Sequence, residues 1–180
     1  MLEIELKMKV KDLSLIRERL LLHHATLLNK KHERDVYYNA PHRDFGQTDE
    51  AVRVRYTNDH AVVTYKGPKI KKFGLKAREE LNFAVECGKT FETMLDRLGF
   101  TKTLEVNKWR ETYKLGTASV SLDIVDGLGT FAEIEVMTES ESDNPTALIE
   151  KIAQEIGVVG EPILASYLEM LLDKQSGKKD

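Results

Sequence analysis

The sequence predicts a mainly antiparallel β protein with helices (α+β), built as an eight-stranded closed β-barrel with the helices packed on its outside. Two observations predict this fold. Segments in which apolar and polar residues alternate recur along the chain, and a period of two is typical of strands with one buried face. These segments also follow the order strand, helix, strand, strand, strand twice over, which is a duplication of architecture and not a sequence repeat.

The first round of elements occupies residues 2–66. Alternation predicts a first strand at 2–10, and leucines at helical spacing after Asp12 predict a helix that reaches about residue 28. Three strands follow, predicted at 31–38, 51–57 and 61–66, and the last two are joined by turn residues. The polar segment 39–50 is expected to be a loop.

The second round occupies residues 75–138. A long strand is predicted at 75–86, then a helix that Gly99 ends, then strands at 103–113, 119–125 and 130–138. Asn144 and Pro145 predict the start of a helix that Gly157 ends, and a last helix is expected over 163–172. We expect one domain over 1–175 and a disordered tail at 176–180.

Composition and charge exclude several classes of protein. The chain has 180 residues, of which 41% are hydrophobic and 32% charged, and its net charge of -3 argues against general nucleic-acid binding. No segment approaches the roughly 20 apolar residues of a membrane helix, and the N-terminus does not resemble a signal peptide. The single cysteine, Cys87, excludes an intramolecular disulfide and fits a reducing compartment. We therefore expect a cytoplasmic protein with no nucleic-acid or membrane partner.

The polar faces of the predicted strands carry many charges. The basic residues on these faces are Lys7, Lys9, Arg53, Arg55, Lys66, Lys76, Arg78, Lys108 and Arg110, and the acidic residues are Glu3, Glu5, Glu80, Asp123, Glu133 and Glu135. A charged face is ordinarily the solvated side of an antiparallel sheet, and this interpretation stays open here. Against it, a chain of net negative charge has gathered a surplus of positive charge on one surface.

This surplus points to a ligand. Positive charge inside a concavity repels itself unless an anion neutralises it, and the pairs Glu3/Glu5 and Glu133/Glu135 repel likewise unless a cation bridges them. A polyphosphate with a divalent metal meets both requirements. Arg and Lys bind phosphoryl oxygens, and carboxylates hold a hard ion such as Mg or Mn that also coordinates phosphates.

Several motifs occur in a fixed order along residues 1 to about 138. They begin with Glu3-x-Glu5-x-Lys7 and continue through the segments 32–37, 52–55, 64–68, 76–80, 108–110, 122–123 and 127–136. In this order and spacing the chain resembles the CYTH superfamily, the triphosphate tunnel metalloenzymes, which include class IV adenylyl cyclases and thiamine triphosphatases. The segment 166–171 also resembles the end of the class IV cyclase branch.

The resemblance implies an antiparallel tunnel with its charged face inward, and it implies roles for individual residues. The metal-binding carboxylates would be Glu3, Glu5, Asp123, Glu133 and Glu135, and the cofactor Mg or Mn. The triphosphate-binding residues would be Lys7, Arg53, Arg55, Lys66, Lys76, Arg78, Lys108 and Arg110. The expected catalytic residues are Glu3, Glu5, Lys66, Glu133 and Glu135. Glu80 is expected to hold Arg78 or Lys76 in place by a salt bridge.

Two features have more than one interpretation. Tyr37 either contacts phosphate or base with its hydroxyl, or only orients the second strand together with Asp35. The lysines of residues 69–72 form either a solvated turn or a lid over the tunnel mouth.

The same lining serves two reactions that the sequence does not separate. In cyclisation, the ribose 3′ oxygen attacks the α phosphorus of ATP and pyrophosphate leaves. In hydrolysis, water attacks the terminal phosphorus of tripolyphosphate, thiamine triphosphate or a nucleotide. The resemblance favours the cyclase, and a non-catalytic triphosphate-binding module is a third alternative. The oligomeric state is also open, with a homodimer among the alternatives.

Overall fold

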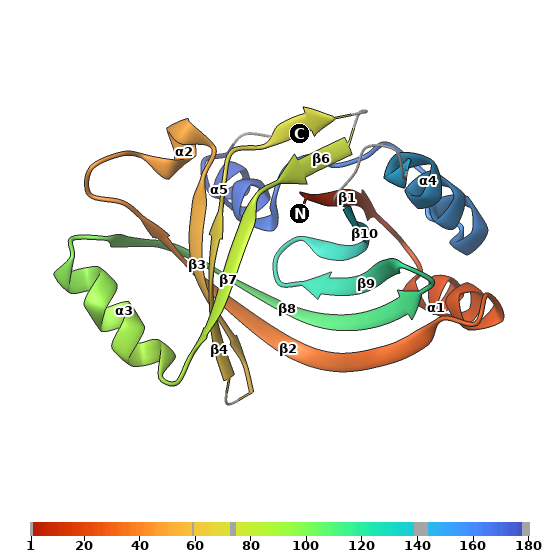
Figure 1. Ribbon diagram of the computed structural model, residues 1–180, viewed down its shortest axis with the longest axis horizontal. Helices are drawn as coiled ribbons and strands as arrows, with labels where there is room; N and C mark the ends of the chain where they lie inside the picture. The colour runs from red at the N-terminus through yellow and green to blue at the C-terminus, as the bar shows by residue number, and fades with distance from the viewer. Residues whose placement is uncertain (1, 59, 73–74, 139–143, 178–180) are drawn as a thin grey trace.

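The computed structural model of this chain describes residues 2–58, 60–72, 75–138 and 144–177. The strands are β1 (Leu2–Lys9), β2 (Thr26–Asn39), β3 (Ala51–Thr57), β4 (His60–Lys66), β5 (Ile70–Lys72), β6 (Leu75–Arg78), β7 (Glu80–Val85), β8 (Thr101–Leu115), β9 (Ala118–Val125) and β10 (Gly129–Thr138). The helices are α1 (Leu13–Leu22), α2 (Phe45–Thr48), α3 (Gly88–Arg97), α4 (Pro145–Ile156) and α5 (Tyr167–Gln175). All strand pairs are antiparallel, in one sheet of order β5-β6-β1-β10-β9-β8-β2-β3-β4-β7 (Figure 1).

The sheet is curled but open, so the predicted closed barrel is wrong. All eight predicted strands are present, but the strand expected at 75–86 is divided at Glu79 into β6 and β7. The first half pairs with β1 and the second with β4, while the additional strand β5 pairs with β6. The sheet therefore has two edges, β5 and β7. Because β6 and β7 are consecutive in the chain, the backbone itself links the two ends of the curled sheet.

The first helix is shorter than its leucine spacing predicts. α1 ends at Leu22 instead of near Leu28, and His24 adopts a left-handed conformation with φ 60° that turns the chain. β2 then begins at once, and Leu27 pairs with Tyr113 of β8. Leu27 and Leu28, which the leucine spacing assigned to the helix, therefore belong to strand β2.

Capping interactions set the bounds of the later helices. α4 lies between Asn144, whose side chain accepts from a backbone N–H of the first turn, and Gly157 with φ 73°, as predicted. α5 begins later than expected because Ser166 is its N-cap, in a reciprocal capping box with Glu169. The expected loop at 39–50 contains the short helix α2. Within the described part of the chain, no helix has the length and apolar character needed to cross a bilayer.

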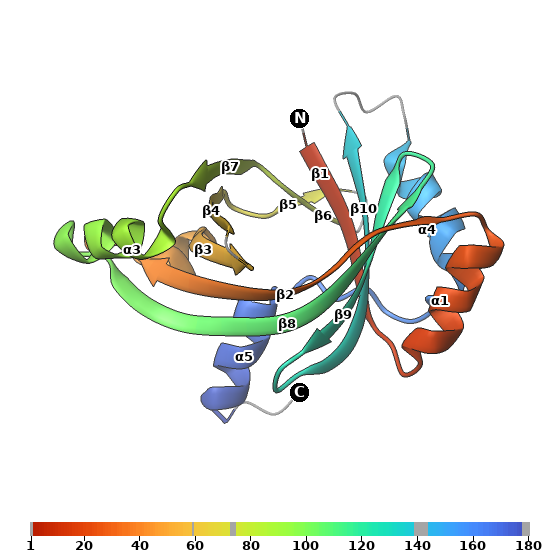
Figure 2. The same ribbon diagram turned by 90° about the horizontal axis from the view of Figure 1, so that it is seen from below.

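The apolar faces of the strands pack against helices on the outside of the sheet, as predicted. One cluster joins Ile4 of β1 to Ile16 of α1 and Ile152 of α4, and a second joins Val54 of β3 to Leu95 of α3. Figure 2 shows α1 and α4 beside each other at one end of the molecule and α3 at the other, with the long strands β2 and β8 between them. The charged faces of the strands are left on the concave side.

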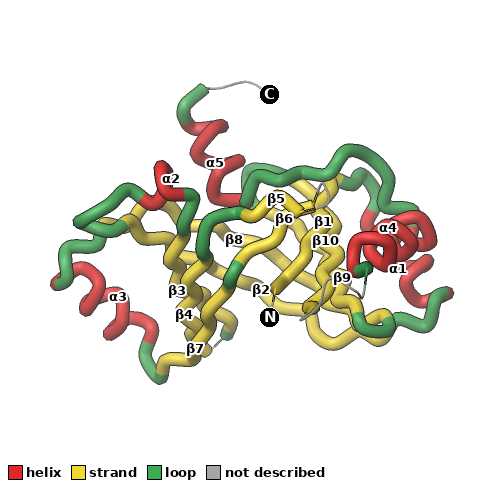
Figure 3. Tube along the Cα trace, turned by 45° about the horizontal axis from the view of Figure 1, so that its top comes forward, coloured by secondary structure: helices red, strands yellow, loops and turns green. Residues whose placement is uncertain are grey.

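A third apolar cluster lies on that concave side. Val106 and Phe131 alternate in phase with the inward residues Lys108 and Glu133, and Tyr167 of α5 packs on Phe131 with ring centroids 5.1 Å apart. Figure 3 shows α5 on a different side of the strands from α1, α3 and α4. α5 therefore covers the inner face next to the charged section.

Candidate functional site

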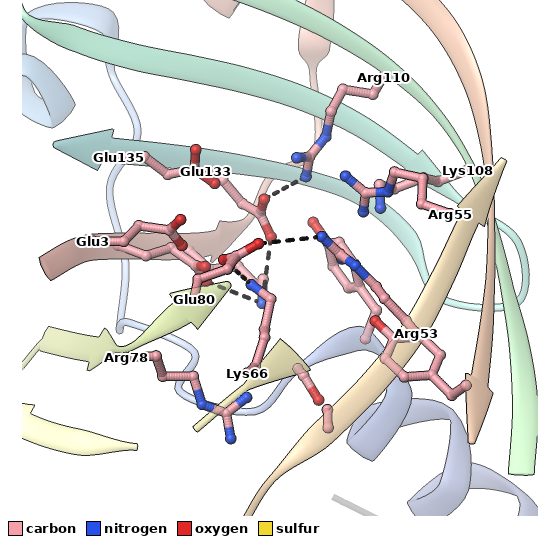
Figure 4. Close-up of a pocket in the computed structure, with 16 residues that line it drawn as sticks. Glu3, Arg53, Arg55, Lys66, Arg78, Glu80, Lys108, Arg110, Glu133 and Glu135 are labelled. Carbon is pink, nitrogen blue, oxygen red and sulfur yellow. Dashed lines mark hydrogen bonds and ion pairs between the residues drawn. The ribbon is translucent and has the colours of Figure 1, made fainter. Parts of the chain in front are cut away.

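A cavity lies between the inward faces of the curled sheet. It contains about 720 Å³ of empty space, including the part open to solvent, and α5 contributes to its wall. The predicted site residues that line it are Glu3, Glu5, Lys7, Arg53, Arg55, Lys66, Arg78, Lys108, Arg110, Glu133 and Glu135 (Figure 4). Several of these side chains are almost fully buried, including Lys7, Lys108 and Glu133. The charged face is therefore not the solvated side of the sheet.

Three predicted residues lie elsewhere or are not described. Lys9 is exposed at the end of β1, and Asp123 is buried but does not line the cavity. The backbone of Lys76 pairs with Glu5, but the Lys76 side chain lies outside the described residues. Among the described residues, the structure thus brings together predicted site residues from strands that are distant in the sequence.

Three carboxylates gather at one side of the cavity. Glu3 and Glu5 project from β1, and Glu135 projects from β10, where it stands directly opposite Glu5 in the antiparallel register. One oxygen from each side chain lies within 4.8 Å of the other two. A set made of carboxylate oxygens alone fits a hard divalent cation such as Mg or Mn, which prefers oxygen ligands.

The cavity shifts the ionisation of two of these carboxyls. Burial raises the pKa of Glu135 to about 8, and the neighbouring carboxylates Glu3 and Glu133 add to this shift. Burial likewise raises the pKa of Glu3 to about 7, and Lys66 opposes the shift. Acidic groups that resist ionisation because they crowd one another are stabilised by a bound cation.

Lys7 separates this carboxylate group from Glu133. Its Nζ lies 3.3 Å from Glu5 Oε1 and 3.4 Å from Glu133 Oε1, and it donates to the backbone oxygen of Ala165 at 3.2 Å. Burial alone would lower the pKa of Lys7, but the two carboxylates outweigh it and the pKa is raised. Lys7 is therefore a charged residue that fixes Glu5 and Glu133 from within the wall.

Asp123 and Glu133 bind Arg110. The Arg110 Nε donates to Asp123 Oδ1 at 2.7 Å, and its Nη2 donates to both Asp123 and Glu133. Tyr167 donates its hydroxyl to Asp123 Oδ2 at 2.8 Å. Among the described residues, the compact carboxylate group of Glu3, Glu5 and Glu135 includes neither Asp123 nor Glu133, so a metal-binding role for these two stays a prediction.

Two buried carboxylates of β2 were not predicted as site residues. Asp35 accepts from Arg55 Nε and Nη2 at 2.6 and 2.7 Å, and Glu33 lies 3.0 Å from Arg55 and 3.1 Å from Lys108. Burial would raise the pKa of both groups, but the cations outweigh it: the pKa of Glu33 is lowered to about 2, and that of Asp35 lies well below its usual range. These carboxylates neutralise part of the basic wall.

A signal for these residues exists in the sequence. Glu33 and Asp35 share a strand face with Tyr37, which lines the cavity, because residues two apart on a strand point the same way. The charged residues expected on the inward face all come from the other strands, so this signal on β2 was missed.

Arg53 and Arg78 each have a side-chain donor that is unsatisfied within the described part of the chain. The Nε of each is buried and has no acceptor among the described residues. Arg78 uses Nη2 instead, which donates to the backbone oxygen and Oδ1 of Asp49 at 2.7 and 2.8 Å. A buried donor without a partner is unfavourable by about 1–3 kcal/mol. Unlike Arg55 and Arg110, whose guanidinium groups are paired with carboxylates, Arg53 and Arg78 each keep one buried donor without an acceptor among the described residues.

Glu80 forms ion pairs with Lys66 and Arg53, and its expected contact with Lys76 falls on a side chain outside the described residues. Its Oε2 lies 2.8 Å from Lys66 Nζ, and its Oε1 lies 3.6 Å from Arg53 Nη2. Burial would raise the pKa of Glu80, but Lys66 and Arg53 lower it to about 2. Arg78, one of its two expected partners, binds Asp49 instead.

The connection after β4 is attached to α5 by Lys69. Its Nζ lies 3.1 Å from Asp49 Oδ1 and also donates to Glu169 of α5. The side chains of Lys71 and Lys72 lie outside the described residues, so the predicted lid stays a prediction.

Tyr167 of α5 also contacts the site. The centroid of its ring lies 4.5 Å from Lys7 Nζ. The resemblance at 166–171 does not by itself predict this contact with the site.

Known proteins are similar to this chain in sequence and in fold. The protein named "Putative adenylate cyclase MJ0240" of Methanocaldococcus jannaschii is 35% identical over 173 residues, which cover 94% of this chain and 98% of that protein. The solved structure of the PH1819 protein from Pyrococcus horikoshii is 39% identical, with a TM-score of 0.85 over 96% of this chain and 99% of the other. HpAC1 from Hippeastrum, 20% identical, has the same fold with a TM-score of 0.71 over 99% and 97% of the two chains. The model of the CYTH domain matches residues 1–163, and the chain therefore belongs to the CYTH domain family.

Proposed function

We propose that this protein is a divalent-metal-dependent enzyme that acts on a triphosphate in the charged cavity, and that its reaction converts ATP to cyclic AMP and pyrophosphate. One arrangement carries the proposal. The carboxylate group of Glu3, Glu5 and Glu135 lies in the same cavity as the unused buried donors of Arg53 and Arg78. A triphosphate with a divalent cation is a single ligand that uses both.

The residues of the cavity position the substrate and neutralise its charge. Arg53 and Arg78 donate to phosphoryl oxygens, and Lys66 and Lys108 add positive charge to the wall. A divalent cation held by the carboxylate group would withdraw charge from the phosphates and orient them. Asp35 keeps Arg55 in a fixed orientation, so part of the basic wall does not have to reorganise as charge moves during the reaction.

In the proposed reaction, the ribose 3′ oxygen forms a bond to the α phosphorus of ATP. The bond from that phosphorus to the oxygen bridging to the β phosphorus breaks, and pyrophosphate leaves with the electron pair. The proton of the 3′ hydroxyl passes to solvent. The basic wall stabilises the charge that collects on the leaving pyrophosphate, and no covalent intermediate with the protein is needed. The name of the M. jannaschii relative supports this choice.

Hydrolysis is the second candidate. HpAC1, which shares the fold, is described as having a dominant triphosphatase activity. The charged cavity would also hold tripolyphosphate or thiamine triphosphate, with water attacking the terminal phosphorus. A non-catalytic binding module has less support, because binding alone would not require a group of three crowded carboxylates.

Product analysis tests the proposal. The protein is incubated with ATP, thiamine triphosphate or tripolyphosphate, each with Mg or Mn, and cyclic AMP, pyrophosphate and phosphate are measured. We expect cyclic AMP and pyrophosphate from ATP in equal amounts, and no product in excess chelator. Release of phosphate without cyclic AMP would select hydrolysis, and no product from any substrate would contradict an enzymatic role.

A further inference from the structure

The segment that leads into α5 holds Lys7 of β1 at both its backbone and its side chain. The backbone N–H of Ile163 donates to the backbone oxygen of Lys7 at 2.8 Å, and the Lys7 Nζ donates to the backbone oxygen of Ala165 at 3.2 Å. The ring centroid of Tyr167 lies 4.5 Å from the same Nζ, a distance at which an aromatic face attracts a cation. Segment 163–167 is therefore attached to a buried lysine in the wall of the charged cavity.

Lys7 restrains two carboxylates of that wall. Its Nζ lies 3.3 Å from Glu5 Oε1 and 3.4 Å from Glu133 Oε1. An ammonium group has three N–H donors, and the contacts with Glu5, Glu133 and the Ala165 oxygen give each of them a direction. Glu5 belongs to the carboxylate group that is proposed to hold the metal. The placement of Lys7 therefore acts on the proposed metal site.

Tyr167 reaches the same wall by a second route. Its hydroxyl donates to Asp123 Oδ2 at 2.8 Å, and Asp123 also accepts from Arg110. Arg110 in turn donates to Glu133, as Figure 4 shows, and Glu133 is the second carboxylate that Lys7 contacts. A continuous chain of contacts thus begins at the Tyr167 hydroxyl and runs through Asp123, Arg110 and Glu133 to Lys7.

Burial makes this chain of contacts sensitive to its first member. Tyr167, Asp123, Glu133 and Lys7 are all buried. A buried acceptor that loses its donor cannot readily replace it with water, so the groups around it rearrange or stay unsatisfied. Loss of the Tyr167 hydroxyl would leave Asp123 with Arg110 as its remaining printed partner and would loosen the orientation of both.

We propose that Tyr167 is a positioning residue for the metal site. Its hydroxyl holds Asp123 and its ring holds Lys7, so that Glu5 stays in the arrangement that binds a divalent cation. Tyr167 acts through these residues and is not itself a metal ligand. The competing interpretation is that Tyr167 only packs α5 on Phe131. The proposal rests on the proposed metal site, and it adds the residue that connects α5 to that site.

Tyr167→Phe isolates the hydroxyl, because the ring and its packing are kept. The matched control is Tyr113→Phe. Tyr113 is also buried and also donates its hydroxyl to a carboxylate, Glu111 Oε2, at 2.8 Å, but it does not line the charged cavity. Each variant loses one hydrogen bond of the same kind, so we expect similar decreases in melting temperature. A difference in metal binding between the two variants then reports the positioning role.

Binding of Mn to the unaltered protein and to each variant is measured by electron paramagnetic resonance, which detects the free ion. We expect the dissociation constant for Mn to rise about threefold to tenfold in Tyr167→Phe and to stay unchanged in Tyr113→Phe. The Mg concentration for half-maximal turnover should rise in the same proportion in Tyr167→Phe, while turnover at saturating Mg changes less than about twofold.

Two results would overturn the inference and leave the proposed function intact. One is normal affinity for Mn in Tyr167→Phe, which would leave Tyr167 with a packing role only. The other is an equal loss of affinity in Tyr113→Phe, which would assign the effect to stability. Absence of Mn binding by the unaltered protein would overturn the metal site and the inference together.

Discussion

Glu5 of β1 and Glu135 of β10 stand directly opposite each other in the sheet, and both line the charged cavity. Like charges at opposed positions of an antiparallel pair are destabilising. Glu3 brings a third carboxylate into the same group. A divalent cation between them would convert this repulsion into a binding site.

Removing one carboxylate should strongly reduce catalysis without loss of the fold. Glu135→Gln keeps the shape of the side chain and removes a charge that burial and two neighbouring carboxylates disfavour. We expect turnover with Mg to fall by about a hundredfold, as for loss of an interaction worth about 2.7 kcal/mol, while the metal-free variant melts no earlier than the unaltered protein. Glu79→Gln, at an exposed glutamate nearby, is the control. Normal turnover by Glu135→Gln would refute the metal-binding role.

The arginines should respond differently to replacement by lysine. Arg53→Lys and Arg78→Lys remove free donors, so triphosphate binding should weaken roughly tenfold to a hundredfold, or about 1.5–3 kcal/mol. Arg55→Lys breaks the two hydrogen bonds to Asp35 and should chiefly lower the melting temperature. Affinity and melting temperature are measured for all three. The distinction fails if Arg55→Lys alone weakens binding.

Glu33 should contribute to stability at neutral pH and lose that contribution in acid. Its pKa is lowered to about 2 in the folded protein, below the ordinary value of 4.5, so folding favours its ionised form. The contribution is complete above the unfolded pKa and disappears as the pH falls toward 2. We expect Glu33→Gln to lower the free energy of unfolding by about 3–5 kcal/mol at pH 7, because Arg55 and Lys108 lose a buried partner.

Denaturant titrations between pH 7 and acid check this behaviour. The difference between Glu33→Gln and the unaltered protein should shrink as the pH falls below the unfolded pKa of the glutamate. Glu150→Gln, at an exposed position on α4, serves as the control and should show no such trend. A difference that stays constant with pH would show that Glu33 is not stabilised as a carboxylate.

Ligand binding should stabilise the fold more than a simple anion does. Tripolyphosphate with Mg spans the basic wall and the carboxylate group, so the melting temperature should rise with its concentration. At about 100 times the dissociation constant the gain is about 2.7 kcal/mol. Sulfate at matched ionic strength reaches fewer donors and should shift the melting temperature much less. Equal shifts for the two anions would indicate general charge screening.

The inward charged face was predictable from the sequence because alternation reports directly which residues share a strand face. The closed barrel was not correctly predicted, for a physical reason visible around Glu79. The alternation of Arg78, Glu80 and Asn82 continues without a break, but the two halves of this segment pair with different strands. Strand partners are set by the tertiary structure, and the two-residue alternation of apolar and polar residues does not show which strands will pair.

The partners of the ion pairs within the site were also not predictable from the sequence. Asp35 and Arg55 are direct partners in the β2–β3 register, and Glu33 lies opposite Lys108 in the β2–β8 register. Register depends on turn lengths and on packing, so the sequence shows the residue types but not which of them neutralise each other. For the same reason the arginines with unused donors, Arg53 and Arg78, stood out only in the structure.

The most direct test of the account is a calorimetric titration of tripolyphosphate into the protein, first with Mg and then with excess chelator. If the carboxylate group holds a cation that also coordinates phosphate, binding with Mg should be at least about tenfold tighter than without it. The Glu135→Gln variant should lose that difference. Equal affinity with Mg and with chelator would contradict a joint site for triphosphate and metal.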